Sequence, residues 1–302
     1  MGLHAIGATV LWLGFAGLLV PGASAFAESG PDAVGTLTLL DGTMSLLRAT
    51  ARYTASEGLR LQPGDVVETG DKAFAQIEFT AGGLVALGPR SRLLLLRFPA
   101  AAAATPRQLF LLEGWIKVAA LQGKQPAALE CLTPLLSVSA TKAIAVVRAS
   151  DRSGEVFAES ATVRIADLSR EGRAESYREV KEGEFYTRAA DRSRGAVMPR
   201  PAQAFVAAVP REFRDDLVPR PGALKRGNVA GKREADFQYA EVKAWLDSLP
   251  AVRALLADRW RDKLGDPAFR EAVAANLKDH PEWERALHAA RDSDARASRK
   301  TP

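Results

Sequence analysis

The stretch that decides the fold runs from Leu59 to Leu96 and reads LRLQPGDVVETGDKAFAQIEFTAGGLVALGPRSRLLLL. Glycine-containing turns separate short runs of apolar and β-branched residues, which is the pattern of consecutive strands. Within Ala73–Phe79 the residues alternate, so that Ile77 shares one face with its apolar neighbours while Gln76 and Glu78 point to the other face. This alternation predicts a strand with one buried face and one wet face.

The same sequence of runs and turns extends from Val34 to about Arg188. Val34–Leu40 and Thr43–Ala49 flank Asp41-Gly42, a turn pair that predicts an opening hairpin. Further strands are expected at Val66–Thr69, Leu84–Leu87, Leu93–Arg97, Gln108–Leu112, Trp115–Ala120, Leu129–Thr133, Leu135–Ala140, Ala143–Arg148, Glu155–Glu159, Thr162–Ala166 and Phe185–Arg188. So many short strands predict an all-β domain over residues 34–188, built as a β-roll, a solenoid-like barrel or a sandwich. The alanine-rich insert 99–106 is bracketed by prolines and predicts a surface loop.

The N-terminal residues 1–27 resemble a secretory signal peptide. The apolar run AIGATVLWLGFAGLLV, residues 5–20, is followed by a Pro-Gly breaker and an Ala-Ser-Ala sequence, with cleavage expected after Ala25 or Ala27. The run is shorter than the roughly 20 apolar residues of a membrane span. Because the first four residues contain no Lys or Arg, a retained N-terminal anchor is the alternative. We expect a periplasmic protein that is not integral to the membrane once the signal peptide is removed.

The composition changes after Arg188. Residues 189–236 are rich in Arg, Pro and Gly and predict a basic tether that could lie along the β-domain, with a short helix at Pro210–Leu217. Residues 237–290 show helical periodicity and predict a bundle of three to four helices, followed by a disordered tail at 291–302. The expected helix starts pair a capping residue with a proline: Ser248 with Pro250, Asp266 with Pro267, and Asp279 or His280 with Pro281.

Three tryptophans, Trp245, Trp260 and Trp283, fall in this helical segment beside Leu and Val residues. Their spacing favours packing in the core of the bundle. The alternative is an exposed aromatic groove that binds a partner or a glycan.

The positive charge is confined to the tether. The chain carries 41 Lys and Arg against 36 Asp and Glu, and residues 191–235 alone hold 10 basic and 5 acidic residues, which is the whole excess. Neither folded part therefore has the basic surface typical of nucleic-acid binding, and we expect no nucleic-acid partner. The basic residues of Arg211–Arg233 are expected to be solvated. The alternative is contact with anionic phospholipid or an acidic cell-wall polymer.

Cys131 is the only cysteine, which excludes an intramolecular disulfide and a cysteine-based metal cluster. A buried, unreactive thiol is expected, with intermolecular pairing as the alternative.

Two patterns resemble reactive sites. Ser139-Ala140-Thr141-Lys142 fits the S-x-x-K pattern of penicillin-binding serine enzymes, but it lies between two β-runs and neither companion motif follows it. His280, Glu284 and His288 are spaced by four residues and could offer a metal two imidazoles and a carboxylate. However, His280 lies at a helix boundary and His288 lies where a helix end favours a cation. We therefore assign no catalytic, cofactor-binding or metal-binding residue and expect no cofactor.

The order of signals in the opening stretch resembles the FecR-like domain of bacterial envelope proteins. The matching motifs are Leu61-Gln62-Pro63-Gly64-Asp65, Thr69-Gly70, Gly88-Pro89-Arg90-Ser91, Leu112-Glu113-Gly114, Thr133-Pro134 and Glu182-Gly183-Glu184. The sequence departs from the family at two turns. It has Ala81-Gly82-Gly83 where the family usually places an acidic residue before Gly, and Ala140-Thr141-Lys142 where the family usually has Arg-Gly-Thr.

The best-known members of this family are cell-surface signalling regulators with a cytoplasmic sigma-factor-binding domain, one membrane span and a periplasmic domain. The present chain resembles the periplasmic part only, so the resemblance implies a fold and a compartment. The family has no established catalytic residues.

These observations predict a non-catalytic, exported protein that acts as a binding or assembly module in the cell envelope. Its partner is expected to be an envelope protein or a cell-wall glycan. The alternative function is an accessory component of envelope signal transduction. A third class, an envelope hydrolase, is disfavoured.

Overall fold

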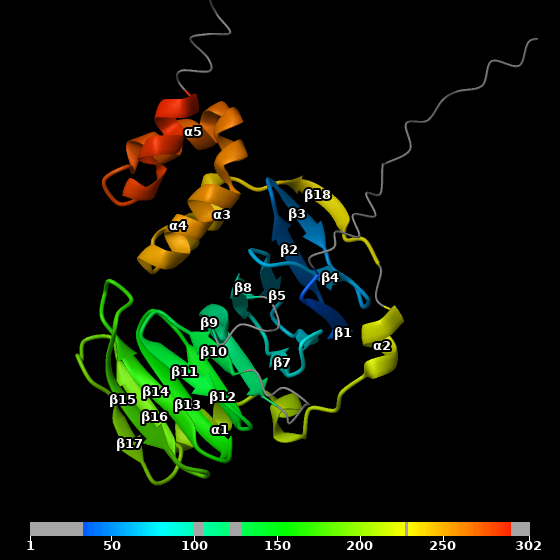
Figure 1. Ribbon diagram of the computed structural model, residues 1–302, viewed down its shortest axis with the longest axis vertical. Coiled ribbons are helices and arrows are strands. Elements are labelled where there is room, and N and C mark those ends of the chain that lie inside the picture. Colours follow the sequence, from blue (N-terminus) through cyan, green and yellow to red (C-terminus); the bar gives the residue numbers. More distant parts are fainter. Residues whose placement is uncertain (1–32, 100–104, 121–127, 227–228, 291–302) are drawn as a thin grey trace, which may run out of the picture.

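A computed structural model describes residues 33–99, 105–120, 128–226 and 229–290. The expected signal peptide, the expected C-terminal tail and most of the alanine-rich insert lie outside these residues. The described chain is mainly β, with a helical region at its C-terminal end (Figure 1). Its 18 strands form one continuous hydrogen-bonded series that curls into two facing sheets, sheet A and sheet B.

The strand pairs of sheet A are all antiparallel, and its strands follow the order β4, β1, β6, β7, β9, β12, β13, β16, β17. Their bounds are β4 Arg60–Leu61, β1 Gly35–Asp41, β6 Phe74–Phe79, β7 Leu84–Leu87, β9 Arg107–Ala119, β12 Ile144–Ala149, β13 Ser153–Ser160, β16 Phe185–Ala189 and β17 Ala196–Met198.

Sheet B follows the order β18, β3, β2, β5, β8, β9, β10, β11, β14, β15. Its further bounds are β18 Lys232–Asp236, β3 Ala51–Thr54, β2 Met44–Arg48, β5 Val66–Thr69, β8 Arg92–Arg97, β10 Leu129–Leu132, β11 Leu136–Ala140, β14 Val163–Leu168 and β15 Ala174–Val180. The pair β9–β10 is parallel.

Strand β9 belongs to both sheets. Its first half pairs with β8 and β10 in sheet B, and its second half pairs with β7 and β12 in sheet A. The sequence predicted two strands here, and the structure joins them through Gly114, whose φ of 96° lets the chain bend without a loop. The two sheets are thus connected covalently at their centre.

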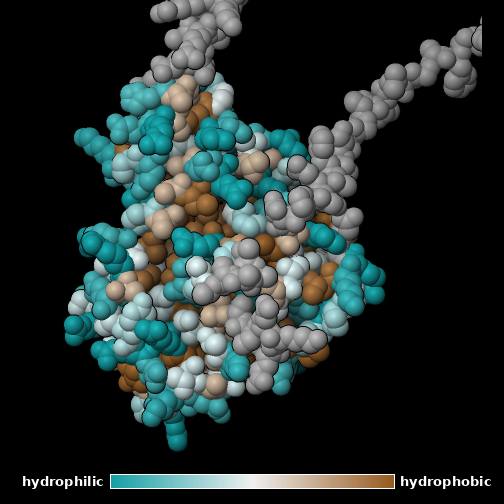
Figure 2. Space-filling view, in the orientation of Figure 1, coloured by the Kyte–Doolittle hydropathy of each residue, from teal (hydrophilic) through white to brown (hydrophobic). Residues whose placement is uncertain are grey.

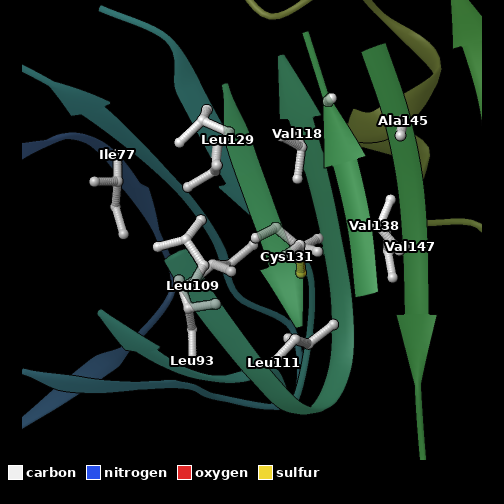
Figure 3. Packing of buried hydrophobic residues seen from close by; sticks show 14 of the residues in the cluster. Ile77, Leu93, Leu109, Leu111, Val118, Leu129, Cys131, Val138, Ala145 and Val147 are labelled. Carbon is white, nitrogen blue, oxygen red and sulfur yellow. The ribbon is translucent and has the colours of Figure 1, made fainter. Parts of the chain in front are cut away.

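The sheets enclose one apolar core, which identifies the fold as a sandwich among the three expected architectures. Side chains from both sheets meet there, with Ile77, Val118 and Val147 from sheet A opposite Leu93, Leu109 and Val138 from sheet B (Figure 3). Cys131 also lies in this core and is fully buried, as expected.

The leucine run of β8 is apolar because both of its faces are buried. Leu93 and Leu95 point into the sandwich core, whereas Leu94 points outward into a second cluster formed with the C-terminal helices. A continuous apolar run is the expected pattern for a strand covered on both sides.

The helical region, residues 237–290, packs on the outer face of sheet B. It contains α3 Tyr239–Leu246, α4 Pro250–Arg259, α5 Pro267–Ala275 and the 3-10 turns η2 Arg261–Gly265 and η3 Pro281–Trp283, followed by helical residues 284–290. Trp245, Trp260 and Trp283 are all buried, so the prediction of core packing is confirmed. Apolar side chains gather in the seam between this region and the strands (Figure 2). No helix in the described ranges has the length and apolar character that a membrane span requires.

Of the expected helix starts, the one at Asp266 is confirmed, because its carboxylate accepts from the backbone amides of Ala268 and Phe269. The start at Pro250 is confirmed with the proline in the first turn of α4, but Ser248 as its cap is wrong, because Leu249 takes that position. The Ser248 hydroxyl instead donates to the Trp245 carbonyl at 2.6 Å, which closes the end of α3. At the third start, η3 follows His280 without a side-chain cap.

Residues 189–236 follow the surface of the sandwich. They contain β17, α1 Gln203–Ala208, the 3-10 turn η1 Arg211–Arg214, α2 Pro221–Arg226 and β18, which pairs with β3 at the edge of sheet B. The turn η1 falls inside the short helix expected at 210–217. The strands β15, β17 and β18 were not expected from the sequence. Exposed charged residues interrupt β15 and β18, and β17 has only three residues, which is too short to show a period-two pattern.

Candidate functional site

The two reactive-site patterns do not assemble. Ser139 lies in β11 and Lys142 lies in the following turn with a φ of 53°, so this tetrad is the end of a strand and a turn. Among the described residues, no group of three or more His, Cys, Asp and Glu is arranged to hold a metal. His280 is buried with its Nε2 2.7 Å from the Tyr239 hydroxyl, whereas Glu284 and His288 are exposed.

The polar turn residues of the opening stretch hold the strands together. The Thr69 hydroxyl donates to the Gly88 carbonyl at 2.7 Å, and the Ser91 hydroxyl accepts from the Trp115 amide at 2.8 Å. Asp65 is buried and accepts two hydrogen bonds from the Arg48 guanidinium. Burial raises the pKa of Asp65, and the bonds from Arg48 oppose that rise.

The Cys131 thiol has no reactive character. It is completely buried in the sandwich core, and burial raises its pKa to about 12. Thiolate formation is therefore suppressed at neutral pH, which agrees with the expectation of an unreactive thiol.

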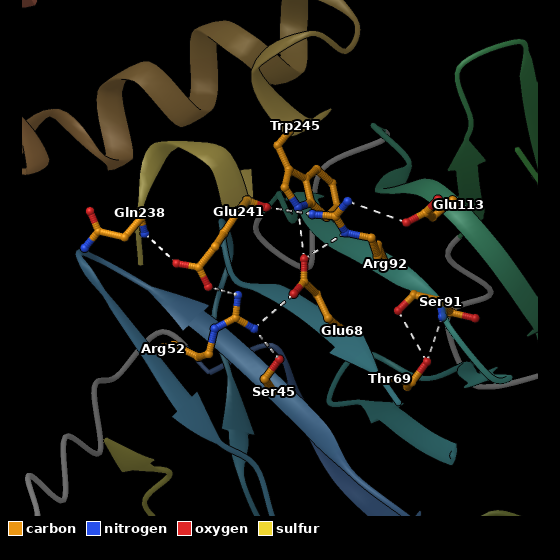
Figure 4. Close-up of polar contacts among 10 residues, drawn as sticks. All are labelled: Ser45, Arg52, Glu68, Thr69, Ser91, Arg92, Glu113, Gln238, Glu241 and Trp245. Carbon is orange, nitrogen blue, oxygen red and sulfur yellow. Dashed lines mark hydrogen bonds and ion pairs between the residues drawn. The ribbon is translucent and has the colours of Figure 1, made fainter. Parts of the chain in front are cut away.

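A partly buried ionic network joins sheet B to the helical region (Figure 4). Glu68 of β5 is its centre. Its carboxylate accepts from Arg52 at 3.1 Å, from Arg92 at 2.8 Å and from the Trp245 indole nitrogen at 3.3 Å. Arg52 also reaches Glu241 at the start of α3 at 3.1 Å, so the network ties three strands, β3, β5 and β8, to one helix.

On the opposite side of the molecule, residues 202–220 lie across the outer face of sheet A, and we call this segment the strap. The Lys117 side chain of β9 is 0% exposed and its ammonium donates to the strap carbonyls of Phe213 at 3.0 Å and Asp215 at 2.9 Å. Its third donor goes to Glu159 at 2.7 Å. A buried ammonium with all three donors satisfied is the arrangement that makes burial of the charge tolerable.

Two side chains of β6 hold the next part of the strap. The Gln76 amide donates to the Val218 carbonyl at 3.0 Å, and the Glu78 carboxylate accepts from the Arg220 backbone amide at 2.7 Å. Glu78 also accepts from the Thr38 hydroxyl at 2.9 Å, which fixes its position on the sheet. The contacts of Gln76 and Glu78 with the strap both reach its main-chain atoms.

Apolar side chains anchor the strap between these polar contacts. Phe205 lies 4.8 Å from Phe185 and 5.2 Å from Trp115, measured between ring centroids, and Phe213 lies 6.2 Å from Phe74. Leu217 joins the same cluster. We call the strap-covered surface the strap groove and define it by the residues that line it, which are Phe74, Gln76, Glu78, Trp115, Lys117 and Phe185.

The predicted wet face of Ala73–Phe79 is therefore wrong. Gln76 is 3% exposed and Glu78 is 5% exposed, because the strap covers them. Sequence reasoning also passed over Lys117, although a lysine inside the apolar run Trp115-Ile116-Lys117-Val118 was a usable signal. A charged residue in a strand that is otherwise apolar on both faces points to a partner that neutralises it.

Part of the β-sandwich matches a known protein family. Residues 65–166, about a third of the chain, match the family model described as FecR protein. The chain contains a FecR domain. The match covers β5 through most of β14, so the FecR domain includes β9 and most of both sheets. No protein with a curated description matches the sequence.

Two crystal structures of a candidate anti-sigma factor from Parabacteroides distasonis resemble the FecR-domain protein in part. Each shares 16% identity with a TM-score of 0.38, and the alignments cover 47% of this chain and 63% and 62% of the other. The chain thus spans less than two thirds of those proteins. At this TM-score the likeness carries no conclusion about fold or function.

Proposed function

We propose that this protein regulates envelope signal transduction in a bacterium by binding other proteins, without catalysing a reaction. The FecR domain is the observation that carries the proposal, because the best-known proteins with this domain are signalling regulators. The assembly-module function expected first from the sequence has no comparable support. We further propose that the protein works in the periplasm, as the N-terminal sequence suggests.

The architecture is compatible with a regulator whose helical region changes its contacts with the β-sandwich. The helical region is attached to the FecR domain through an apolar seam and through the network centred on Glu68. Ionic contacts in such a seam give specificity of docking more than affinity. A binding partner that competes for Glu241 or Arg92 would thereby alter how the helical region is held.

Deletion of the gene in its own bacterium, followed by transcript profiling and complementation, tests the proposal. A signalling regulator changes a small, defined set of transcripts, and the full-length protein restores them. An assembly module instead changes envelope permeability or composition without a defined transcriptional response, and that result would contradict the proposal. Fractionation of the complemented cells checks the compartment independently.

A further inference from the structure

The strap groove recognises a peptide main chain. Lys117, Gln76 and Glu78 together make four hydrogen bonds to the strap, three to carbonyl oxygens and one from a backbone amide. Side-chain groups that bind only backbone atoms do not depend on which side chains the bound segment carries. These four hydrogen bonds are therefore open to any segment that adopts the backbone conformation of the strap, with its carbonyls and its amide at these positions.

An empty groove would be unfavourable. Lys117 is completely buried, and two of its three donors end on strap carbonyls. Glu159, its remaining partner, lies on the neighbouring part of sheet A and satisfies one donor only. Loss of the strap would expose the rings of Phe74 and Phe185 to water and leave two donors of the ammonium to be satisfied by solvent. Burial of these rings therefore favours a covered groove over an empty one.

The strap itself is held at few points. Within residues 190–226 the buried residues are Phe205, Pro210, Phe213 and Leu217. The helix α2 that follows has no buried residue, and β17 before it is exposed along its whole length. A segment with so few buried contacts can detach without opening the sandwich core.

We propose that the strap groove is a peptide-binding site and that the strap is its built-in competitor, displaced when a partner protein offers a segment with matching anchors. The matching segment carries an aromatic residue, a second aromatic residue eight positions later and an aliphatic residue four positions after that, as Phe205, Phe213 and Leu217 do. This inference goes beyond the signalling proposal, since it concerns what the groove binds whatever pathway the protein serves.

A fluorescent peptide of residues 202–220 tests the groove directly. The full chain carrying Phe213→Ala and Leu217→Ala has a weakened strap and is expected to bind the peptide in an anisotropy titration. The wild-type chain is expected to bind about tenfold or more weakly, because its own strap competes at high effective concentration. A second peptide that keeps the two phenylalanines and the leucine, with alanine or serine elsewhere, is expected to bind with similar affinity.

Lys117→Met in the weakened-strap protein tests the main-chain recognition. Two hydrogen bonds from a buried cation are lost, so peptide affinity is expected to fall about tenfold or more. Lys72→Met is the matched control, because Lys72 is exposed at the turn before β6 and should leave affinity unchanged.

Folding of every variant is checked by hydrogen exchange of the core strands β9 and β12, which should remain protected. With those strands protected, failure of the weakened-strap protein to bind either peptide would overturn the proposal. Equal binding by the Lys117→Met and Lys72→Met proteins would overturn the main-chain mechanism. These binding experiments and the transcript profiling are independent of each other. Failure of the peptide-binding proposal would therefore not contradict the signalling proposal.

Discussion

Charged residues buried in this sandwich are matched by specific partners. Asp167 in β14 is 0% exposed and accepts from the Tyr186 hydroxyl at 2.8 Å and from the Ser176 hydroxyl at 3.3 Å, with the Arg188 guanidinium 3.8 Å away. These groups join β14 and β15 of sheet B to β16 of sheet A. A buried carboxylate is stabilising only while such partners remain, so this cluster holds together the end of the sandwich that is farthest from β18.

Tyr186→Phe should change how stability depends on pH. Burial, followed by the hydrogen bond to Asp167, raises the pKa of Tyr186 to about 12 from an ordinary value of 10.0. Between these values the unfolded chain binds fewer protons than the folded one, so the unfolding free energy falls as pH rises. The variant loses this dependence. From pH 8.5 to pH 11 the full shift would narrow the stability gap between wild type and variant by little more than about 1 kcal/mol, and screening by solvent near the sheet edge lowers the expected change to about 1 kcal/mol or less.

Urea unfolding at the two pH values measures the gap directly. The other tyrosines and the lysines titrate in both proteins and cancel in the comparison. Parallel pH curves for the two proteins would contradict the assignment of the raised pKa to this hydroxyl.

At the scale of single elements, β9 depends on one glycine. A Cβ at Gly114 would overlap the Cα of Ser91 and lie 2.6 Å from the Arg90 carbonyl oxygen, and the φ of 96° is itself unfavourable for other residues. Gly114→Ala should therefore destabilise the protein by about 3 kcal/mol or more. Gly82→Ala is the matched control, since Gly82 has a φ of 84° with no atom within 4 Å of its added Cβ.

Thermal or urea unfolding of the two alanine variants separates steric overlap from backbone strain. The control should lose only about 1–2 kcal/mol, the cost of a left-handed backbone for alanine. Equal losses at the two sites would show that β9 and β8 can separate slightly, and that the bend in β9 is not closely packed.

The strands could be predicted where they have a buried face, and less well where they do not. Period-two alternation located most strands of both sheets, whereas the continuous leucine run of β8 was predicted as a strand without its burial on two sides. The edge strands β15 and β18 carry charged, exposed residues and gave no such signal. The alternation of polar and apolar residues shows which side chains of a strand are polar, but it does not show whether another segment covers them. The residue that binds Glu78, Arg220, lies 142 positions further along the chain. The strap groove was therefore not predictable from local pattern.

At the scale of the whole molecule, the C-terminal part of the chain covers both outer faces of the sandwich. The strap covers sheet A and the helical region covers sheet B, so polar and apolar residues that would otherwise face water are enclosed. These parts of the two outer faces are thus occupied within the chain, so a partner that binds them must displace one of the two covers.

Glu68→Gln should loosen the helical cover without unfolding the sandwich. The substitution removes the carboxylate that accepts from Arg52, Arg92 and Trp245, and the expected loss is about 1–3 kcal/mol. Glu113→Gln is the control, because Glu113 is half exposed and contacts Arg92 at 3.5 Å, which predicts a loss of about 0.5 kcal/mol or less. Hydrogen exchange should increase in α3 for the first variant only. Unchanged exchange in α3 would show that the apolar seam alone holds the helices.

Truncation after residue 236 tests what the helical cover protects. It would expose Leu47, Val66, Leu94 and Phe110, each completely buried beneath the helices in the full chain. An apolar sheet face of this kind drives association, so the truncated protein should form dimers or larger species at micromolar concentration in size-exclusion chromatography and bind a hydrophobic dye. The same truncation carrying Leu94→Gln and Phe110→Gln should be monomeric. If the unsubstituted truncation is monomeric and binds no dye, the outer face of sheet B must close on itself, and the helices are then attached to the sandwich without being needed to shield it.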